Sequence, residues 1–298
     1  PSALRFVLAV ILSFGTSYAL YTFGAPYTAG ELSAVSRRVV ELEEVLAFPA
    51  WRIVELGVGW LAGYDDYDVA ALIILTRLPY YFLLNTFYEV SLTTSALALT
   101  FDVVSAALPF TFLRKRHLEH VSSAPKSAVP NQGVINNKTI FGLTSLLSSS
   151  LYTIVLYASF RTWLPVFVAT HFHDLPTLEL AHSRGYVDLL PLFVPLGWAA
   201  FAFLFSPSAG AQNNLGDARA AAFNPATASM WDHIVHNAWG WEKGTRVLIS
   251  RTVVIGILVG VGTWVRVWGT VEGAESLGAL GWAALWAGAG ALNAAAVG

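Results

Sequence analysis

The chain has 298 residues, of which 55% are hydrophobic and 12% are charged, and its formal net charge is -2. A soluble domain usually carries about 25% charged residues, so a globule of this composition could not cover its surface with charge, and a soluble protein is excluded. The chain lacks the basic excess that binds nucleic acid, and it has no cysteine for disulfides, thiolate metal sites or thiol nucleophiles. We therefore expect an all-α, multi-pass integral membrane protein.

Apolar segments of spanning length follow one another along most of the chain. A crossing helix needs about 20 mostly apolar residues, because the hydrocarbon core is roughly 30 Å thick. We predict a single transmembrane domain over residues 1–298, built as a bundle of about seven crossing helices, with six to eight as the range. The predicted spans are residues 4–24, 68–88, 91–113, 140–160, 187–205, 247–268 and 277–298.

Basic residues between the spans predict which loops share a side of the membrane. A cluster at 114–117 directly follows the third span, and cytoplasmic-type loops carry such an excess of Lys and Arg. Loops 114–139 and 207–245 are therefore predicted to lie inside. Loops 161–186 and 269–276 are then predicted to lie outside.

Residues 45–63 are apolar enough to cross a membrane but contain Arg52 and Glu55. A charged residue at the bilayer centre costs at least about 2.5 to 3.5 kcal/mol, although charges at i and i+3 on one helix face can neutralise each other. We expect an interfacial or re-entrant helix here, which leaves the amino terminus outside. The alternative is an eighth span, which would place the amino terminus inside.

Two further amphipathic segments are predicted to be interfacial helices. Residues 31–46 carry an apolar stripe opposite charged residues, and an oligomerisation helix is the alternative. Residues 226–240 place two tryptophans on the apolar side and His233 and His236 on the polar side. We interpret these histidines as a solvated face rather than as metal ligands, because no third ligand is nearby.

The last two spans contain the small residues that allow membrane helices to pack closely. We expect helix packing at Gly256, Gly260, Gly281 and Gly288. Packing within the chain is the simpler interpretation, and contact with a second copy in a homo-oligomer is the alternative.

One loop gathers residues of the kinds that bind metals. It contains His171, His173 and Asp174, followed by Glu179 and His182 at the Glu-x-x-His spacing of carboxylate metal sites. A polar interfacial loop is the simpler interpretation. The metal hypothesis supports an integral-membrane metalloenzyme.

Arg77 and Asp102 are the most informative intramembrane charges. They lie at equal distances from a predicted turn at residues 89 and 90, which places both near mid-depth in an antiparallel helix pair. An unpaired charge there would be expensive, so we expect Arg77 and Asp102 to neutralise each other, as a structural pair or as part of a conduction pathway.

The sequence carries no recognised catalytic or nucleotide-binding signature, so an enzyme is not favoured and no cofactor is required. Intramembrane charges and helix-breaking prolines favour a channel or transport protein for ions or small polar solutes. The first alternative is a membrane scaffold or assembly subunit of a larger complex, and the second is the metalloenzyme. The expected partners are the lipid bilayer and either further copies of the chain or other membrane subunits.

Overall fold

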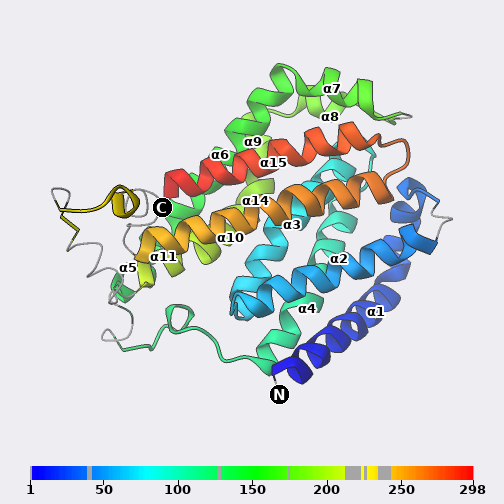
Figure 1. Ribbon diagram of the computed structural model, residues 1–298. Coiled ribbons are helices and arrows are strands. Elements are labelled where there is room, and N and C mark those ends of the chain that lie inside the picture. The colour runs from blue at the N-terminus through cyan, green and yellow to red at the C-terminus, as the bar shows by residue number, and fades with distance from the viewer. Residues whose placement is uncertain are drawn as a thin grey trace.

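The computed structural model describes residues 2–38, 42–125, 129, 131–173, 175–211, 223–224, 227–233 and 243–297. Over these residues the chain is helical, apart from turns and isolated backbone bridges (Figure 1). The longer helices are α1 (Ser2–Val35), α2 (Leu42–Leu61), α3 (Asp66–Phe87), α4 (Leu92–Leu113), α6 (Lys138–Arg161), α14 (Lys243–Thr270) and α15 (Ser276–Val297). The shorter ones are η1 (Leu118–His120), α5 (Gln132–Ile135), α7 (Leu164–His171), α8 (Glu179–Ser183), α9 (Tyr186–Leu189), η2 (Leu190–Phe193), α10 (Val194–Ala200), η3 (Phe201–Phe205) and α11 (Ser206–Gly210).

Seven helical segments of the described chain are long and apolar enough to cross a membrane. They coincide with the seven predicted spans, although the first helix extends to Val35 and the sixth begins at Lys243. The fifth segment, Tyr186–Gly210, is interrupted where prolines remove backbone donors, so that it passes through the 3-10 helix η2 and the π-helical turn η3.

Helix α3 is the centre of the bundle, with most of its length buried. It packs against α4, α14 and α10, while α1 packs on α4 and α15 packs on α14 and α6. Asp65 caps the start of α3 by accepting a hydrogen bond from Asp68 N, and Ser91 caps α4 by accepting one from Thr94 N. These caps fix the ends of the α3–α4 hairpin, in which Glu89 has a positive φ of 58°.

Helix α2 covers most of the segment over 45–63 for which an interfacial or re-entrant helix is expected. The Phe48 ring packs over Gly269 at the end of α14, and Trp60, near the end of α2, packs against Phe6 and Phe110. Between them, Glu55 contacts the middle of α3 through Arg77. Helix α2 therefore runs from one end of the bundle to the other, between α1 and α14 (Figure 1).

The single helix predicted over 31–46 is interrupted. Helix α1 ends at Val35, Ser36 forms an antiparallel bridge with Val271, and Arg37 N donates to Thr270 O at 2.8 Å. The prediction was wrong because the α14–α15 turn takes the backbone groups that a continuing helix would need. Residues 39–41 lie outside the described part of the chain.

The predicted interfacial helix over 226–240 falls mostly outside the described residues. Its described part is helical at 230–233, where the Met230 and Trp231 side chains are exposed. His236 lies outside the described residues.

Turns and polar segments gather at the two ends of the bundle. The basic end is defined by Arg114–His120 and by the start of α14, and the opposite end by the 36–38, 88–91 and 271–275 turns. Both chain termini lie toward the basic end (Figure 1).

Candidate functional site

Arg77 lies at the centre of the bundle, in the middle of α3, with its side chain fully buried. Its Nε atom is 3.6 Å from Asp102 Oδ2 on α4, so the structure brings the two predicted charges together. Arg77 Nη2 also donates to Glu55 Oε2 on α2, at closer range. The principal partner of Arg77 is therefore Glu55, which sequence spacing within one hairpin could not reveal.

The Asp102 side chain on α4 contacts side chains from three other helices. Arg266 Nη1 on α14 lies 3.5 Å from Asp102 Oδ2, and the Tyr81 hydroxyl on α3 donates to the same oxygen at 3.0 Å. The Tyr21 hydroxyl on α1 donates to Asp102 Oδ1 at 3.2 Å. We call Glu55, Arg77, Asp102 and Arg266 the central cluster. It ties α1, α2, α3, α4 and α14 together.

Arg52 and Glu55 do not neutralise each other along α2, as their i and i+3 spacing had suggested. Glu55 accepts hydrogen bonds from Arg77 and from Trp51 Nε1, the latter at 3.0 Å. Arg52 Nη2 instead donates to Ser105 Oγ at 2.8 Å and to Asp102 O at 3.3 Å. Both charges of α2 thus point into the bundle, which explains how an apolar helix can hold them.

A second buried cluster lies at the basic end, between α3 and α14. Arg251 forms a bidentate ion pair with Asp68, in which Nη2 lies 3.1 Å from Oδ2. Arg251 Nη1 also donates to Phe203 O at 3.0 Å. Only 6% of Arg251 is exposed. Asp68 is the third residue of α3 and Arg251 the ninth of α14, so their positions along the helices gave no signal that they would pair.

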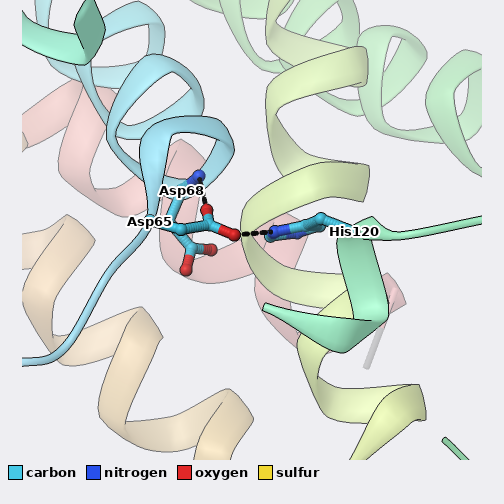
Figure 2. Close-up of side chains that lie close together, drawn as sticks. All are labelled: Asp65, Asp68 and His120. Atoms are coloured by element: carbon cyan, nitrogen blue, oxygen red, sulfur yellow. Dashed lines mark hydrogen bonds and ion pairs between the residues drawn. The ribbon is translucent and has the colours of Figure 1, made fainter. Parts of the chain in front are cut away.

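Asp65 joins the segment after α4 to this cluster. Its Oδ2 atom accepts from His117 N at 2.8 Å and lies 2.8 Å from His120 Nδ1. Figure 2 shows the Asp65 carboxylate between the Asp68 backbone nitrogen and the His120 ring. The other ring nitrogen of His120 lies 3.3 Å from Ala202 O. Because both ring nitrogens face acceptors, the doubly protonated imidazolium satisfies this site best.

The ionisation of the basic-end cluster follows from these contacts. Burial opposes ionisation of Asp65, but the hydrogen bonds and charge of His120 outweigh it and hold the pKa of Asp65 below its usual range. Burial likewise opposes protonation of His120, yet its bond to Asp65 raises the pKa of His120 above the ordinary 6.5. The Asp68 carboxylate, whose Oδ2 atom lies 3.4 Å from His117 Nδ1, raises the pKa of His117. We call Asp65, Asp68, His117, His120 and Arg251 the basic-end cluster.

Asp65, Asp68 and His120 are close enough to hold a metal ion, with ligand atoms all within 4.8 Å of one another. Their donor set fits a metal poorly, because Arg251 already pairs with both oxygens of Asp68. A metal ligand histidine must also be neutral, whereas the pKa of His120 is raised. We interpret the group as an ion-pair cluster that fastens α3 to α14 and to the segment after α4.

The predicted metal loop is divided in the structure. His171 Nδ1 and His173 Nε2 each lie 2.9 Å from an oxygen of Glu275, at the α14–α15 turn. These two hydrogen bonds lower the pKa of Glu275. The pair fastens the end of α7 to the turn, a contact that the sequence analysis missed.

Glu179 and His182 belong to the short helix α8 and make other contacts. Glu179 N donates to Thr177 Oγ1 at 3.0 Å, and His182 O accepts from Arg161 Nη1 at 3.0 Å, so these contacts are made by the backbone of both residues. Asp174 lies outside the described residues. Nothing in the described part of the loop joins these residues to His171 and His173 as one ligand set.

The predicted packing glycines behave differently from one another. Gly281 lies under the Phe167 ring with no room for a Cβ atom, and a Cβ atom on Gly260 would be in ordinary contact with α15. Gly256 and Gly288 have nothing within 4 Å of an added Cβ atom. Close packing within the chain therefore involves two of the four.

A cavity of 620 Å³ opens beside the basic-end cluster. Its lining includes the charged residues His117, Glu119, Lys243 and Arg251.

Comparison with known proteins gives one family likeness. Residues 137–265, less than half of the chain, match the Bouquet formation protein 3 C-terminal domain. The matched segment runs from the start of α6 into α14, and so includes Arg251 but not Arg266 or the α2–α4 side of the two clusters. No curated protein and no solved structure matches the chain.

Proposed function

We propose that this protein is a multi-pass membrane scaffold, an assembly subunit whose buried charges hold the bundle together. The central cluster carries the proposal. Arg77, Glu55 and Asp102 are at most 5% exposed, and each lies against an opposite charge contributed by another helix. Residues that line an ion path must meet water or the ion, whereas these three are enclosed by protein. The geometry thus favours the scaffold over the channel that the composition favoured.

The family likeness agrees with an assembly role. The name of the matching domain refers to bouquet formation. That term describes an arrangement, and it names neither a reaction nor a transported solute. The match covers part of the chain, so it supports the proposal without defining the partner.

The proposal includes a topology with both ends of the chain on one side. The seven apolar helical segments together with α2 give eight crossings. Support comes from the backbone of Arg37, which is bonded to Thr270 at the opposite end, and from Trp60, which lies near Phe6 at the basic end. A buried Glu55 is tolerable in a crossing helix because Arg77 neutralises it.

Single-cysteine labelling tests this topology cleanly, because the chain has no cysteine of its own. We would introduce Arg38→Cys, Glu272→Cys and Lys115→Cys separately and label sealed vesicles with a membrane-impermeant maleimide. Eight crossings predict that positions 38 and 272 label from one side and position 115 from the other. Labelling of position 38 from the same side as position 115 would restore the seven-span topology with α2 at the interface.

The scaffold function is tested by two measurements on the full chain. In proteoliposomes, the wild type and Arg266→Gln should both give ion flux no higher than protein-free vesicles. In native membranes extracted with mild detergent, the chain should sediment as part of a particle larger than itself. Flux that Arg266→Gln abolishes would establish a channel, and a flux-silent chain that sediments as a monomer would overturn the scaffold.

A channel remains the second candidate because of the cavity at the basic end. Its 620 Å³ opening, lined by Lys243, His117 and Glu119, has the polar character of a vestibule. The flux measurement distinguishes the two candidates.

A further inference from the structure

An apolar cleft of 250 Å³ lies on the surface of α3, between α4 and the η2–α10 segment. The α3 residues that form its floor, from Leu78 to Asn85, recur at i, i+3, i+4 and i+7 and so belong to one helix face. Its α4 wall, from Leu92 to Leu99, repeats the same spacing. Pro191 and Pro195 form the other wall, where η2 interrupts the fifth segment.

The cleft follows the direction of the helices. Asn85 lies near the end of α3 and Leu78 lies seven residues deeper, a separation of about 10 Å at the helical rise. The cleft therefore extends from the opposite end of the bundle toward its middle, and it is apolar along most of that length. This is the shape of a slot for part of one extended hydrocarbon chain.

Two polar side chains lie near the outer part of the cleft, and the first of them has no hydrogen-bond partner. Ser95 lines the cleft and is 5% exposed, and its Oγ atom has no hydrogen-bond partner. A buried hydroxyl without a partner is destabilising, so a ligand acceptor at this position would be stabilising.

The second group is Arg184, at the outer edge of the cleft. Its guanidinium donates to Asn85 Oδ1 at 2.7 Å and to Thr86 Oγ1 at 3.0 Å, and it lies 5.9 Å from the Phe82 ring centroid. Both Asn85 and Phe82 line the cleft. Within the described part of the chain, no carboxylate oxygen lies within 4.0 Å of Arg184. Arg184 is thus a positioned, partly exposed cation whose hydrogen-bond acceptors are both neutral.

We propose that the cleft binds one phospholipid, with an acyl chain along the α3 floor and its phosphate against Arg184. The Ser95 hydroxyl would then donate to an ester carbonyl oxygen between the two. This inference rests on the membrane insertion in the proposed function, because the α3–α4 turn must lie at headgroup level. The charge of Arg184 selects a phospholipid over an uncharged amphiphile.

Native mass spectrometry of the delipidated full chain in detergent tests the site. We would titrate phosphatidylglycerol and diacylglycerol with identical acyl chains. One phosphatidylglycerol should bind at least about fivefold more tightly than diacylglycerol, the factor expected for one cation near a phosphate. Arg184→Gln should remove that preference, whereas Arg161→Gln, at the same end of the bundle, should keep it.

A second pair of variants tests the cleft itself. Ala96→Trp fills the α4 wall and should abolish binding of both lipids, whereas Thr93→Trp, exposed on the same helix outside the cleft, should not. Ala96→Leu replaces Ala96→Trp if circular dichroism shows misfolding. Unchanged binding in the filled variant, or an unchanged headgroup preference in Arg184→Gln, would overturn the assignment. This titration is done in detergent, so its failure is separate from failure of the cysteine topology.

Discussion

Arg251 and Asp68, which are 183 positions apart in the sequence, form a buried bidentate ion pair that joins the first half of α14 to the start of α3. The guanidinium also lies 4.8 Å from the Tyr64 ring centroid and 4.7 Å from that of Phe203. Two aromatic rings thus cover the guanidinium, and the Asp68 side chain is fully buried. Removal of the arginine should be costly because the carboxylate is shielded from water.

We predict that Arg251→Met destabilises the protein by about 3 to 5 kcal/mol, because it removes the bidentate partner of the buried Asp68 carboxylate and leaves it only the His117 ring, 3.4 Å away. The double variant Arg251→Met, Asp68→Leu should recover most of that loss, since it leaves no unpaired charge. Thermal unfolding in detergent micelles measures both. Equal destabilisation by the single and double variants would show that the unpaired Asp68 carboxylate is not the cause of the loss of stability.

In the central cluster, Arg77 should couple more strongly to Glu55 than to Asp102. Double-mutant cycles with Arg77→Met against Glu55→Gln and against Asp102→Asn should give the larger coupling energy for Glu55, within the 0.5 to 3 kcal/mol usual for contacting residues. The charge swap Arg77→Asp, Asp102→Arg should not restore stability, because it places an aspartate beside Glu55. A full rescue by the swap would instead make the hairpin pair of Arg77 and Asp102 dominant.

Because of the basic-end cluster, the stability of the protein should fall both when the pH is raised and when it is lowered. The raised pKa of His117 and His120 gives stabilisation that is complete below about 6.5 and is lost as the pH rises through the folded-state values. The lowered pKa of Asp65 gives stabilisation that is present above about 3.8 and is lost as the pH falls through its folded-state value. The cluster therefore stabilises most between about pH 4 and 6.5.

Melting temperature measured against pH checks this dependence. His120→Asn should weaken the decline above pH 6.5, and Asp65→Asn should weaken the decline on the acid side. His182→Asn, which changes a histidine outside the cluster, should leave the profile as in the wild type. A His120→Asn profile identical to wild type would remove His120 from the titrating group.

Gly197 of α10 lies where two helices approach each other closely, outside the charge clusters. A Cβ atom there would overlap the Ser145 carbonyl oxygen and Ser149 Oγ on α6, so the helices must separate to admit it. We predict that Gly197→Ala destabilises by about 1 to 3 kcal/mol. Gly142→Ala on α6, where an added Cβ atom meets nothing within 4 Å, should stabilise by about 0.5 to 1 kcal/mol. Chemical unfolding of the two variants in parallel provides the comparison.

The sequence by itself determined the helical segments and their approximate limits. Seven apolar runs of spanning length match seven helices, because apolar length is a local property that each segment carries alone. The sequence also placed Arg77 and Asp102 at the same depth, because the two residues are equally far along the chain from the short turn of an antiparallel hairpin.

Only the tertiary structure decided which charged residues pair with one another and where α2 packs. Glu55 reaches Arg77, and Arg251 reaches Asp68, across helices that are distant in the sequence. Which helices become neighbours depends on how whole helix faces pack. A hydropathy profile counts each charged residue as unfavourable, because it contains no information about the residue that will neutralise the charge. That is why Arg52 and Glu55 argued against a crossing helix in the sequence, whereas in the folded bundle both are buried and held by α3 and α4.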